Sequence, residues 1–310
     1  MNFPRRSALY LWTVVACCFC TSALAAPKKK HSTKRKSPPA IEAVRALPVN
    51  PRSSASDESS GPEGSSKGVP SVAAAAVIVI DARTGAVLYE KNADAQRAAA
   101  STQKLLTSLI VAERGYLDKD VTVMQTDTLA EPTKLNIKPG ETYRRIDLLR
   151  ALLVKSPNDV ARCLARDSAG SLEDFAVLMN QRARELGATN SHFINPNGLP
   201  MPGQYSSARD LSLIARAAYA NPTIRSIVSL PTLVFRYADG HTRELTNTNK
   251  ILTRLPYCNG MKTGYTDAAG HCLISSGARP GRDVIAVVLG DPKSRIWNDS
   301  AALLSWALWM

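Results

Sequence analysis

The order of expected secondary-structure elements predicts an α+β fold, in which helices cover a largely antiparallel sheet. Three observations support this class. A hairpin pattern opens the folded region, a long central stretch has helical periodicity, and strand-like segments followed by one helix close the chain. No internal repeat is visible.

The hairpin consists of an apolar, β-branched run over Ala74–Asp81, a turn over Ala82–Gly85, and a second strand over Ala86–Tyr89. A helix is expected next, over Ser101–Ala112, because Leu105, Leu106, Leu109 and Ile110 share one stripe.

Further helical patterns follow as far as about residue 227, and Gly- and Pro-containing breaks separate some of them. They cover Arg145–Val154, Asp159–Arg166, Leu172–Leu186 and Ala208–Ala220. The strand-like segments after them are Thr232–Tyr237, Asn259–Tyr265, Gly270–Ala278 and Val284–Gly290. The last helix, Arg295–Trp309, carries an apolar stripe that we expect to pack on the sheet rather than to anchor in a membrane.

The first 26 residues have the layout of a secretory signal peptide. Arg5 and Arg6 precede an apolar run, Ala8–Phe19, which is too short to span a bilayer, and small residues follow at Ala23–Ala25. The segment around Cys17 also resembles a lipoprotein cleavage box, which leaves lipidation of Cys17 as an alternative. An exported, periplasmic or envelope-associated protein is predicted.

Residues 27–68 are rich in Pro, Ser, Lys and Gly and cannot bury a core, so we expect a disordered linker before a folded domain at 69–310. The formal charge of the chain is +13, and this linker carries nine Lys or Arg against four acidic residues. In an exported protein, such a basic run favours contact with an anionic envelope surface over nucleic acid. The alternative is a solvated tail without a specific partner.

Cysteines and histidines do not indicate a metal site or a cofactor. Outside the leader, the cysteines are Cys163, Cys258 and Cys272, and we expect them to be buried or free thiols. The four histidines show no H-E-x-x-H or paired spacing, which argues against a metallopeptidase. A Ser-His-Asp triad is not excluded by spacing, because triads are recognised by geometry.

Ser101-Thr102-Gln103-Lys104 is the first segment with chemical meaning. Positions i and i+3 share a helix face, so the Lys104 amine can lie one turn from the Ser101 hydroxyl. A serine attacks an amide only when a base takes its proton, and a lysine is a base only when burial or a neighbouring cation lowers its pKa. The motif alone is weak, since about one S-x-x-K is expected by chance in a chain of this composition.

Two further segments complete a set. Ser156-Pro157-Asn158 lies between two helical patterns, where the alternative interpretation is a helix N-cap. Lys262-Thr263-Gly264 lies on an expected strand and offers a cation and a hydroxyl to a carboxylate, while Gly264 permits close approach of a ligand. The order S-x-x-K, S-x-N, K-T-G is typical of penicillin-binding proteins and serine β-lactamases.

Over about residues 70–310 the chain resembles the D-alanyl-D-alanine carboxypeptidases, the low-molecular-mass penicillin-binding proteins of peptidase family S11. The resemblance implies a β-lactamase/transpeptidase-like fold, with a five-stranded, mainly antiparallel sheet and an inserted helical lobe. The stretches that support it are Ala98–Thr107, His192–Leu199, Ser207–Leu211, Asn247–Leu252 and Gly260–Leu273.

The resemblance also implies roles for the site residues and no cofactor. Ser101 would be the acylated nucleophile and Lys104 its general base, while Ser156 would relay protons. The substrate would be held by Asn158, Lys262, Thr263, Gly264, Tyr265 and, in a weaker match, Arg295. Backbone N–H groups of Ser101 and Tyr265 would form the oxyanion hole.

The implied function is a serine-type carboxypeptidase that trims D-Ala from peptidoglycan stem peptides and is inhibited by β-lactams. One departure is Pro157, where the family usually has Gly. An endopeptidase that cuts D-alanyl-diaminopimelate cross-links is an alternative. A β-lactamase is disfavoured because Phe193–Leu199 holds no acid, and a non-catalytic penicillin sensor is disfavoured by the presence of both Ser101 and Lys104.

Overall fold

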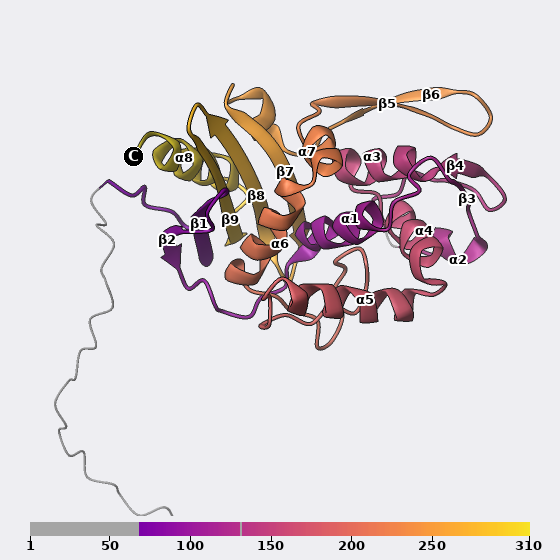
Figure 1. Ribbon diagram of the computed structural model, residues 1–310, viewed down its shortest axis with the longest axis horizontal. Coiled ribbons are helices and arrows are strands. Elements are labelled where there is room, and N and C mark those ends of the chain that lie inside the picture. The colour runs from indigo at the N-terminus through magenta and orange to yellow at the C-terminus, as the bar shows by residue number, and fades with distance from the viewer. Residues whose placement is uncertain (1–67, 131) are drawn as a thin grey trace, which may run out of the picture. The chain divides into compact units, whose positions relative to one another are not determined.

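The computed structural model describes residues 68–130 and 132–310 (Figure 1). The predicted leader and nearly all of the predicted linker lie outside these residues. In the described part of the chain, no helix is long and apolar enough to cross a membrane.

One five-stranded sheet organises the domain, with the strand order β2-β1-β9-β8-β7 and antiparallel pairing between neighbours. The two N-terminal strands therefore pair with strands from the end of the chain. The five strands are β1 (Ala76–Asp81), β2 (Val87–Lys91), β7 (Cys258–Thr266), β8 (Gly270–Arg279) and β9 (Arg282–Asp291).

Alternation along the strands gives the sheet two apolar faces. Val77 and Val79 of β1 pack with helix α8 (Ile296–Trp309), whereas Ile78 and Ile80 belong to the larger core under the other helices. Figure 1 shows α8 on one side of the sheet and α6 (Ala208–Ala220) on the other. The predicted packing of the last helix on the sheet is confirmed.

Between β2 and β7 the chain forms the inserted helical lobe. The lobe begins with the 3₁₀ turn η1 (Ala100–Gln103), which leads directly into α1 (Lys104–Glu113), so the helix expected from Ser101 starts as a tighter turn. Its other helices are α2 (Gln125–Thr128), α3 (Arg145–Lys155), α4 (Asn158–Ala169), α5 (Leu172–Glu185), α6 and α7 (Pro222–Val228). The antiparallel strands β7, β8 and β9 near the C-terminus, together with the helical lobe, confirm the predicted α+β fold.

Two small hairpins lie outside the main sheet. β3 (Asp120–Thr122) pairs with β4 (Thr142–Arg144), and β5 (Thr232–Arg236) pairs with β6 (Thr242–Thr246). The strand predicted over Thr232–Tyr237 is confirmed as β5, but it pairs only with β6 and does not join the five-stranded sheet. Figure 1 shows β5 and β6 extending over the helical lobe, away from the five-stranded sheet.

Cys163, Cys258 and Cys272 are free and buried, as predicted. Cys258 lies opposite Gly277 and Cys272 lies opposite Gly264, so the two cysteines of this hairpin do not face each other.

Candidate active site

Ser101 lies on the tight turn at the start of α1. Ala100, just before it, has φ +47°, a left-handed conformation that orients the turn. Lys104 is the first residue of α1, and its Nζ donates to Ser101 Oγ at 2.9 Å. The i, i+3 relation predicted from the sequence is therefore a direct hydrogen bond.

Lys104 is completely buried and forms no ion pair within the described residues. Its second partner is Asn158 Oδ1, at 2.7 Å. Burial lowers the pKa of the Lys104 amine well below its ordinary value, and the nearby charge of Lys262 lowers it further, while Asp159 opposes this. The amine is therefore biased toward the neutral form that accepts a proton.

The Ser156–Asn158 segment joins α3 to α4. Ser156 is the C-cap of α3 with φ +67°, and its buried Oγ has no hydrogen-bond partner in the described structure. Because Ser156 ends one helix and does not cap the next, the N-cap interpretation is wrong. Pro157 takes the N-cap position of α4 with φ −67°, the value that its ring requires, which explains how Pro is accepted there.

Asn158 is the first residue of α4 and faces the nucleophile from the lobe. Its amide Nδ2 donates to Pro132 O at 2.9 Å, and its backbone N–H donates to Thr133 O at 2.7 Å. These contacts fix the amide so that its oxygen meets Lys104.

Strand β7 forms the opposite wall. Lys262 is 1% exposed, its Nζ donates to Thr263 O at 3.0 Å, and burial lowers its pKa to about 7. Thr263 Oγ1 donates to Thr248 Oγ1 at 2.7 Å. A cation and a hydroxyl thus lie on consecutive residues of one strand.

Gly264 allows β7 to lie against the nucleophile turn. A Cβ at this position would be 2.9 Å from Ser101 N and 3.0 Å from Thr102 N. Any side chain would push the strand away from the backbone of the serine. The K-T-G motif therefore ends in Gly for a steric reason that concerns the nucleophile as well as a ligand.

These walls enclose a cavity of about 300 Å³. Among the predicted residues, the cavity is lined by Ser101, Ser156, Asn158, Thr263, Gly264 and Tyr265. Tyr265 is exposed, its ring stacks on His271 at 4.4 Å, and its hydroxyl donates to Asp267. Further lining comes from residues that the sequence did not single out, including Thr248, His271 and Trp297.

Arg295 is not among the lining residues. Its Nε donates to Asp299 Oδ1 at 3.0 Å, at the start of α8. The neighbouring Ile296 and Trp297 do line the cavity. A role for Arg295 in binding a carboxylate stays a prediction, as does the oxyanion hole at the Ser101 and Tyr265 N–H groups.

A loop at residues 195–198 supports the nucleophile turn, and sequence reasoning gave it no such role. Gln103 Nε2 donates to Asn195 O, Thr107 Oγ1 donates to Pro196 O at 2.7 Å, and Ser101 Oγ lies 3.4 Å from Asn197 O. A Cβ on Gly198 would be 2.0 Å from Ala100 O. The available signal was the Asn-Pro-Asn-Gly sequence, which indicates a tight turn but not its partner.

The described residues contain no group of three or more His, Cys, Asp or Glu arranged to hold a metal ion. The site instead brings together four side-chain groups. They are the Ser101 hydroxyl, the buried Lys104 amine, the Asn158 amide and the Lys262 amine on β7. This fold with this site defines a serine hydrolase of the acyl-enzyme type.

Comparisons with known proteins identify the family. The sequence profile of the D-alanyl-D-alanine carboxypeptidases, peptidase family S11, matches residues 63–293. D-alanyl-D-alanine carboxypeptidase DacB2 of Mycobacterium tuberculosis is 37% identical over 236 residues, 74% of this chain and 80% of that protein. The chain therefore belongs to the D-alanyl-D-alanine carboxypeptidase family, as its motifs predicted.

Solved structures agree with this assignment. A D-alanyl-D-alanine carboxypeptidase from Mycobacterium tuberculosis H37Rv has a TM-score of 0.73 at 35% identity, with coverage of 77% of this chain and 92% of that chain. The Streptomyces K15 DD-transpeptidase also has a TM-score of 0.73, at 28% identity and 77% and 98% coverage. The chain spans only 59% and 62% of the length of the relatives DacF of Bacillus subtilis and DacC of Escherichia coli.

Proposed function

We propose that this protein is a serine-type D-alanyl-D-alanine carboxypeptidase that removes the terminal D-Ala from peptidoglycan stem peptides. The observation that carries the proposal is the 2.9 Å hydrogen bond between Lys104 Nζ and Ser101 Oγ, made by a lysine with no exposed surface. A buried, weakly basic amine beside a hydroxyl is the arrangement that serine acylation needs.

In the acylation step, neutral Lys104 takes the proton of Ser101 Oγ as the oxygen attacks the carbonyl carbon of the scissile amide. The negative charge on the carbonyl oxygen is stabilised by the backbone N–H groups of Ser101 and Tyr265. Collapse of the intermediate breaks the C–N bond. Ser156, which is among the residues that line the cleft, passes a proton from Lys104 to the departing D-Ala amine.

Substrate position is set by the two walls. Asn158 holds the peptide amide, while Lys262 and Thr263 hold the terminal carboxylate, with Arg295 as an additional cation. Gly264 lets the peptide lie close to β7. These assignments are supported by the lining of the cleft, to which Asn158, Thr263 and Gly264 contribute.

Water then hydrolyses the acyl-enzyme and regenerates Ser101. With a β-lactam, attack opens the ring and the amine stays attached, so no leaving group departs. The loop at 195–198 offers no carboxylate to activate water for release. Slow release of β-lactams is expected, which makes the protein a penicillin target rather than a β-lactamase.

The setting of the enzyme is also proposed here. Residues 1–26 act as a signal peptide, 27–68 as a basic linker and 69–310 as the catalytic domain. Export places the domain in the periplasm or at the cell envelope, where the linker contacts an anionic surface. Support comes from the leader pattern and from the D-alanyl-D-alanine substrate named in the family description.

The test is mass spectrometry of muropeptides before and after treatment with the purified enzyme. Loss of one D-Ala from monomeric pentapeptides is expected, and conversion of cross-linked dimers to monomers without that loss would indicate an endopeptidase instead. Ser101→Ala should abolish both peptide cleavage and covalent labelling by fluorescent penicillin. Labelling that persists on another residue would contradict the nucleophile assignment.

A further inference from the structure

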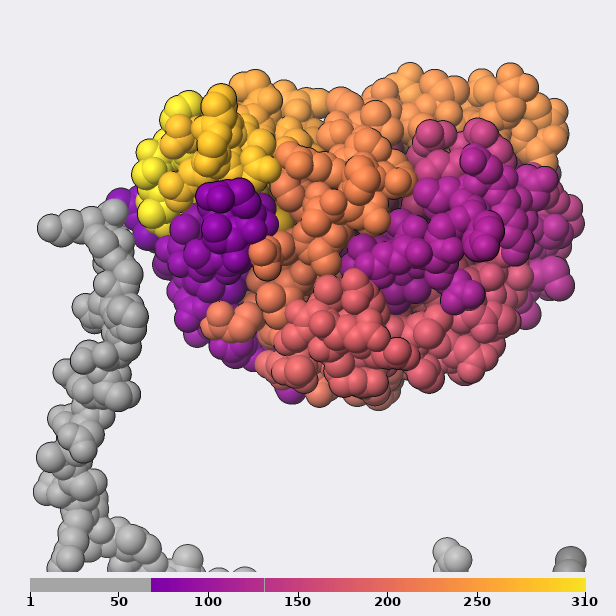
Figure 2. All heavy atoms as spheres, in the orientation of Figure 1, coloured from indigo at the N-terminus to yellow at the C-terminus, as the bar shows by residue number. Residues whose placement is uncertain are grey.

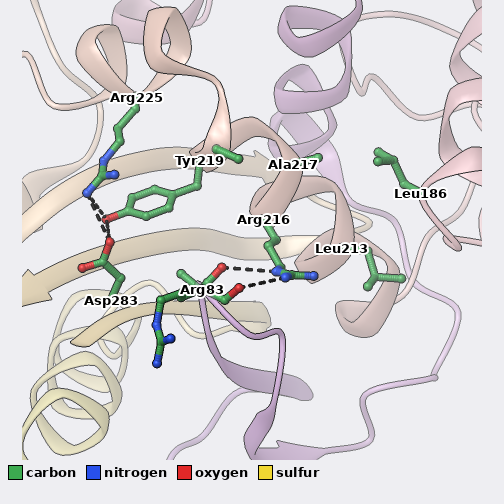
Figure 3. A pocket seen from close by; sticks show the side chains of 10 residues that line it. Arg83, Leu186, Leu213, Arg216, Ala217, Tyr219, Arg225 and Asp283 are labelled. Carbon is green, nitrogen blue, oxygen red and sulfur yellow. Dashed lines mark hydrogen bonds and ion pairs between the residues drawn. The ribbon is translucent and has the colours of Figure 1, made fainter. Parts of the chain in front are cut away.

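A second cavity, of about 430 Å³, lies between the β1–β2 turn, α6, α7 and the start of β9 (Figure 3). It shares no lining residue with the catalytic cleft. The two cavities lie toward opposite ends of β8. The second cavity is near Asp283, which pairs with Ala278 at one end of β8, and the cleft is near Tyr265, which pairs with His271 at the other end. Indigo atoms of the β1–β2 hairpin meet orange atoms of α6 on the face shown in Figure 2.

Two of its arginines are fixed by their surroundings. Arg216 Nε donates to Ala82 O at 3.2 Å and its Nη2 donates to Arg83 O at 2.9 Å, so it holds the hairpin turn against α6. Arg225 donates to Tyr219 OH at 2.9 Å and to Asp283 at 3.2 Å, and it stacks over the Tyr219 ring. Figure 3 shows both networks facing the same space.

The charge of the cavity is unbalanced. Its lining residues include three arginines, Arg83, Arg216 and Arg225, and one acidic residue, Asp283. Arg225 alone among these arginines forms an ion pair within the described residues. The nearby Asp81 carboxylate accepts hydrogen bonds from the turn, at the Arg83 and Thr84 N–H groups. Excess positive charge therefore remains for an anionic ligand.

The rest of the lining is small and apolar. Leu186 and Leu213 form one wall, and Ala217 and Ala220 continue it along α6. A suitable ligand therefore combines carboxylates with short aliphatic groups, since guanidinium forks match carboxylates and methyl groups match this wall. A neutral sugar or a cation satisfies neither requirement.

We propose that this cavity, called here the arginine pocket, binds a second peptidoglycan stem peptide through its carboxylates. This inference rests on the proposed function, because it takes the wall peptide as the polymer on which the enzyme works. Stem peptides carry both free carboxylates and alanine methyl groups. A second attachment point raises the effective concentration of the enzyme at the wall without touching the reacting bond.

The test measures sedimentation with purified sacculi after the enzyme has been acylated with benzylpenicillin, which fills the catalytic cleft. Arg83→Glu reverses a charge whose side chain makes no hydrogen bond in the described structure, and it should weaken binding by roughly tenfold. Arg236→Glu on β5 is the matched control, because Arg236 is exposed and forms no ion pair with the described residues, and this change should alter binding by less than about twofold.

A second arm uses sacculi whose stem-peptide carboxylates have been amidated, which leaves any attached phosphate polymer charged. Binding of the unmodified enzyme should fall to the Arg83→Glu level. The proposal is overturned if Arg83→Glu binds normally, if Arg236→Glu is equally impaired, or if the unmodified enzyme binds amidated sacculi as tightly as untreated sacculi. Cleavage of a soluble pentapeptide should be the same for Arg83→Glu and the unmodified enzyme, so failure of catalysis and failure of the pocket are separable.

Discussion

Two lysines lie buried at the catalytic cleft, and neither forms an ion pair within the described residues. Burying a charged amine without a carboxylate partner is unfavourable, so burial shifts both groups toward their neutral forms. Lys262 also lowers the pKa of Lys104. The two lysines can therefore take different roles. Lys104, whose pKa is lowered further, is suited to act as the base, whereas Lys262, with a pKa of about 7, keeps a substantial charged fraction.

Replacing Lys104 by Arg tests the base directly. The guanidinium stays protonated at any working pH, so Lys104→Arg should reduce the rate of acylation by at least about 10²-fold, although the positive charge is kept. Stopped-flow acylation by a fluorescent penicillin measures this, with the thermal unfolding midpoint as the check on folding. A folded Arg variant that acylates at the normal rate would remove the general-base role.

Lys262→Arg should change the pH dependence of kcat/KM. In the unmodified enzyme, deprotonation of Lys262 near pH 7 removes the cation that binds the substrate carboxylate, so kcat/KM should fall as the pH rises through that value. An arginine stays charged, and the alkaline fall should move to higher pH. Acylation measured at pH 6 serves as the control that the cleft is formed. An unchanged alkaline limb would show that another group titrates.

At the scale of elements, the nucleophile turn is held between two backbones. Strand β7 approaches it at Gly264, and the loop at residues 195–198 approaches it at Gly198. Both contacts depend on the absence of a Cβ, because a side chain at either glycine would clash with the backbone of the nucleophile turn. The position of Ser101 therefore depends on segments about 100 and 160 residues away in the chain as much as on its own helix.

Gly198→Ala should disturb this arrangement, because its Cβ would be 2.0 Å from Ala100 O. Gly140→Ala is a matched control, with nearly the same φ (+87° against +84°) and nothing within 4 Å of the added Cβ. The Gly198 variant should lose at least about 2 kcal/mol more stability than the Gly140 variant in urea unfolding, and it should also acylate more slowly. Equal losses would mean that backbone strain alone matters.

At the scale of the whole molecule, one buried carboxylate is expected to set part of the pH dependence of stability. Asp291 at the end of β9 is 2% exposed, and neither of its oxygens has a hydrogen-bond partner within the described residues. Burial raises its pKa from 3.8 to about 6, and Asp299 adds to this, while Arg295 and Lys91 act in the opposite direction. Between pH 3.8 and about 6, the folded chain therefore holds a proton on Asp291 that the unfolded chain releases.

The sign of the effect follows from this difference. The contribution of Asp291 is fully present below pH 3.8 and is lost as the pH rises through about 6, at a cost of at most about 3 kcal/mol. Asp291→Asn should therefore stabilise the protein more at pH 8 than at pH 4, relative to the unmodified chain. Urea unfolding at both pH values measures the difference. A variant whose relative stability is the same at both would contradict the assignment.

Much of the architecture follows from local patterns in the sequence. The β-branched run before Ala82 predicted β1 because alternate residues can fill two apolar faces, and the stripe beginning at Leu105 predicted α1 because its residues share one helix face. The three motifs also indicated the family, since their residue types serve one chemistry in a fixed order. Helix α7 and strand β6 were missed because their short segments have weak periodicity of their own.

The sequence by itself determined which groups are available: a serine with a lysine one turn along, an amide after a helix end, and a cation on a strand. Only the tertiary structure decided that Lys104 forms hydrogen bonds with both Ser101 and Asn158. It also decided that Arg295 donates to Asp299, and that two glycines allow neighbouring backbones to lie against the nucleophile turn. The physical reason is range. Periodicity and caps depend on residues a few positions apart, whereas burial, pKa and close backbone approach depend on segments that meet only after folding.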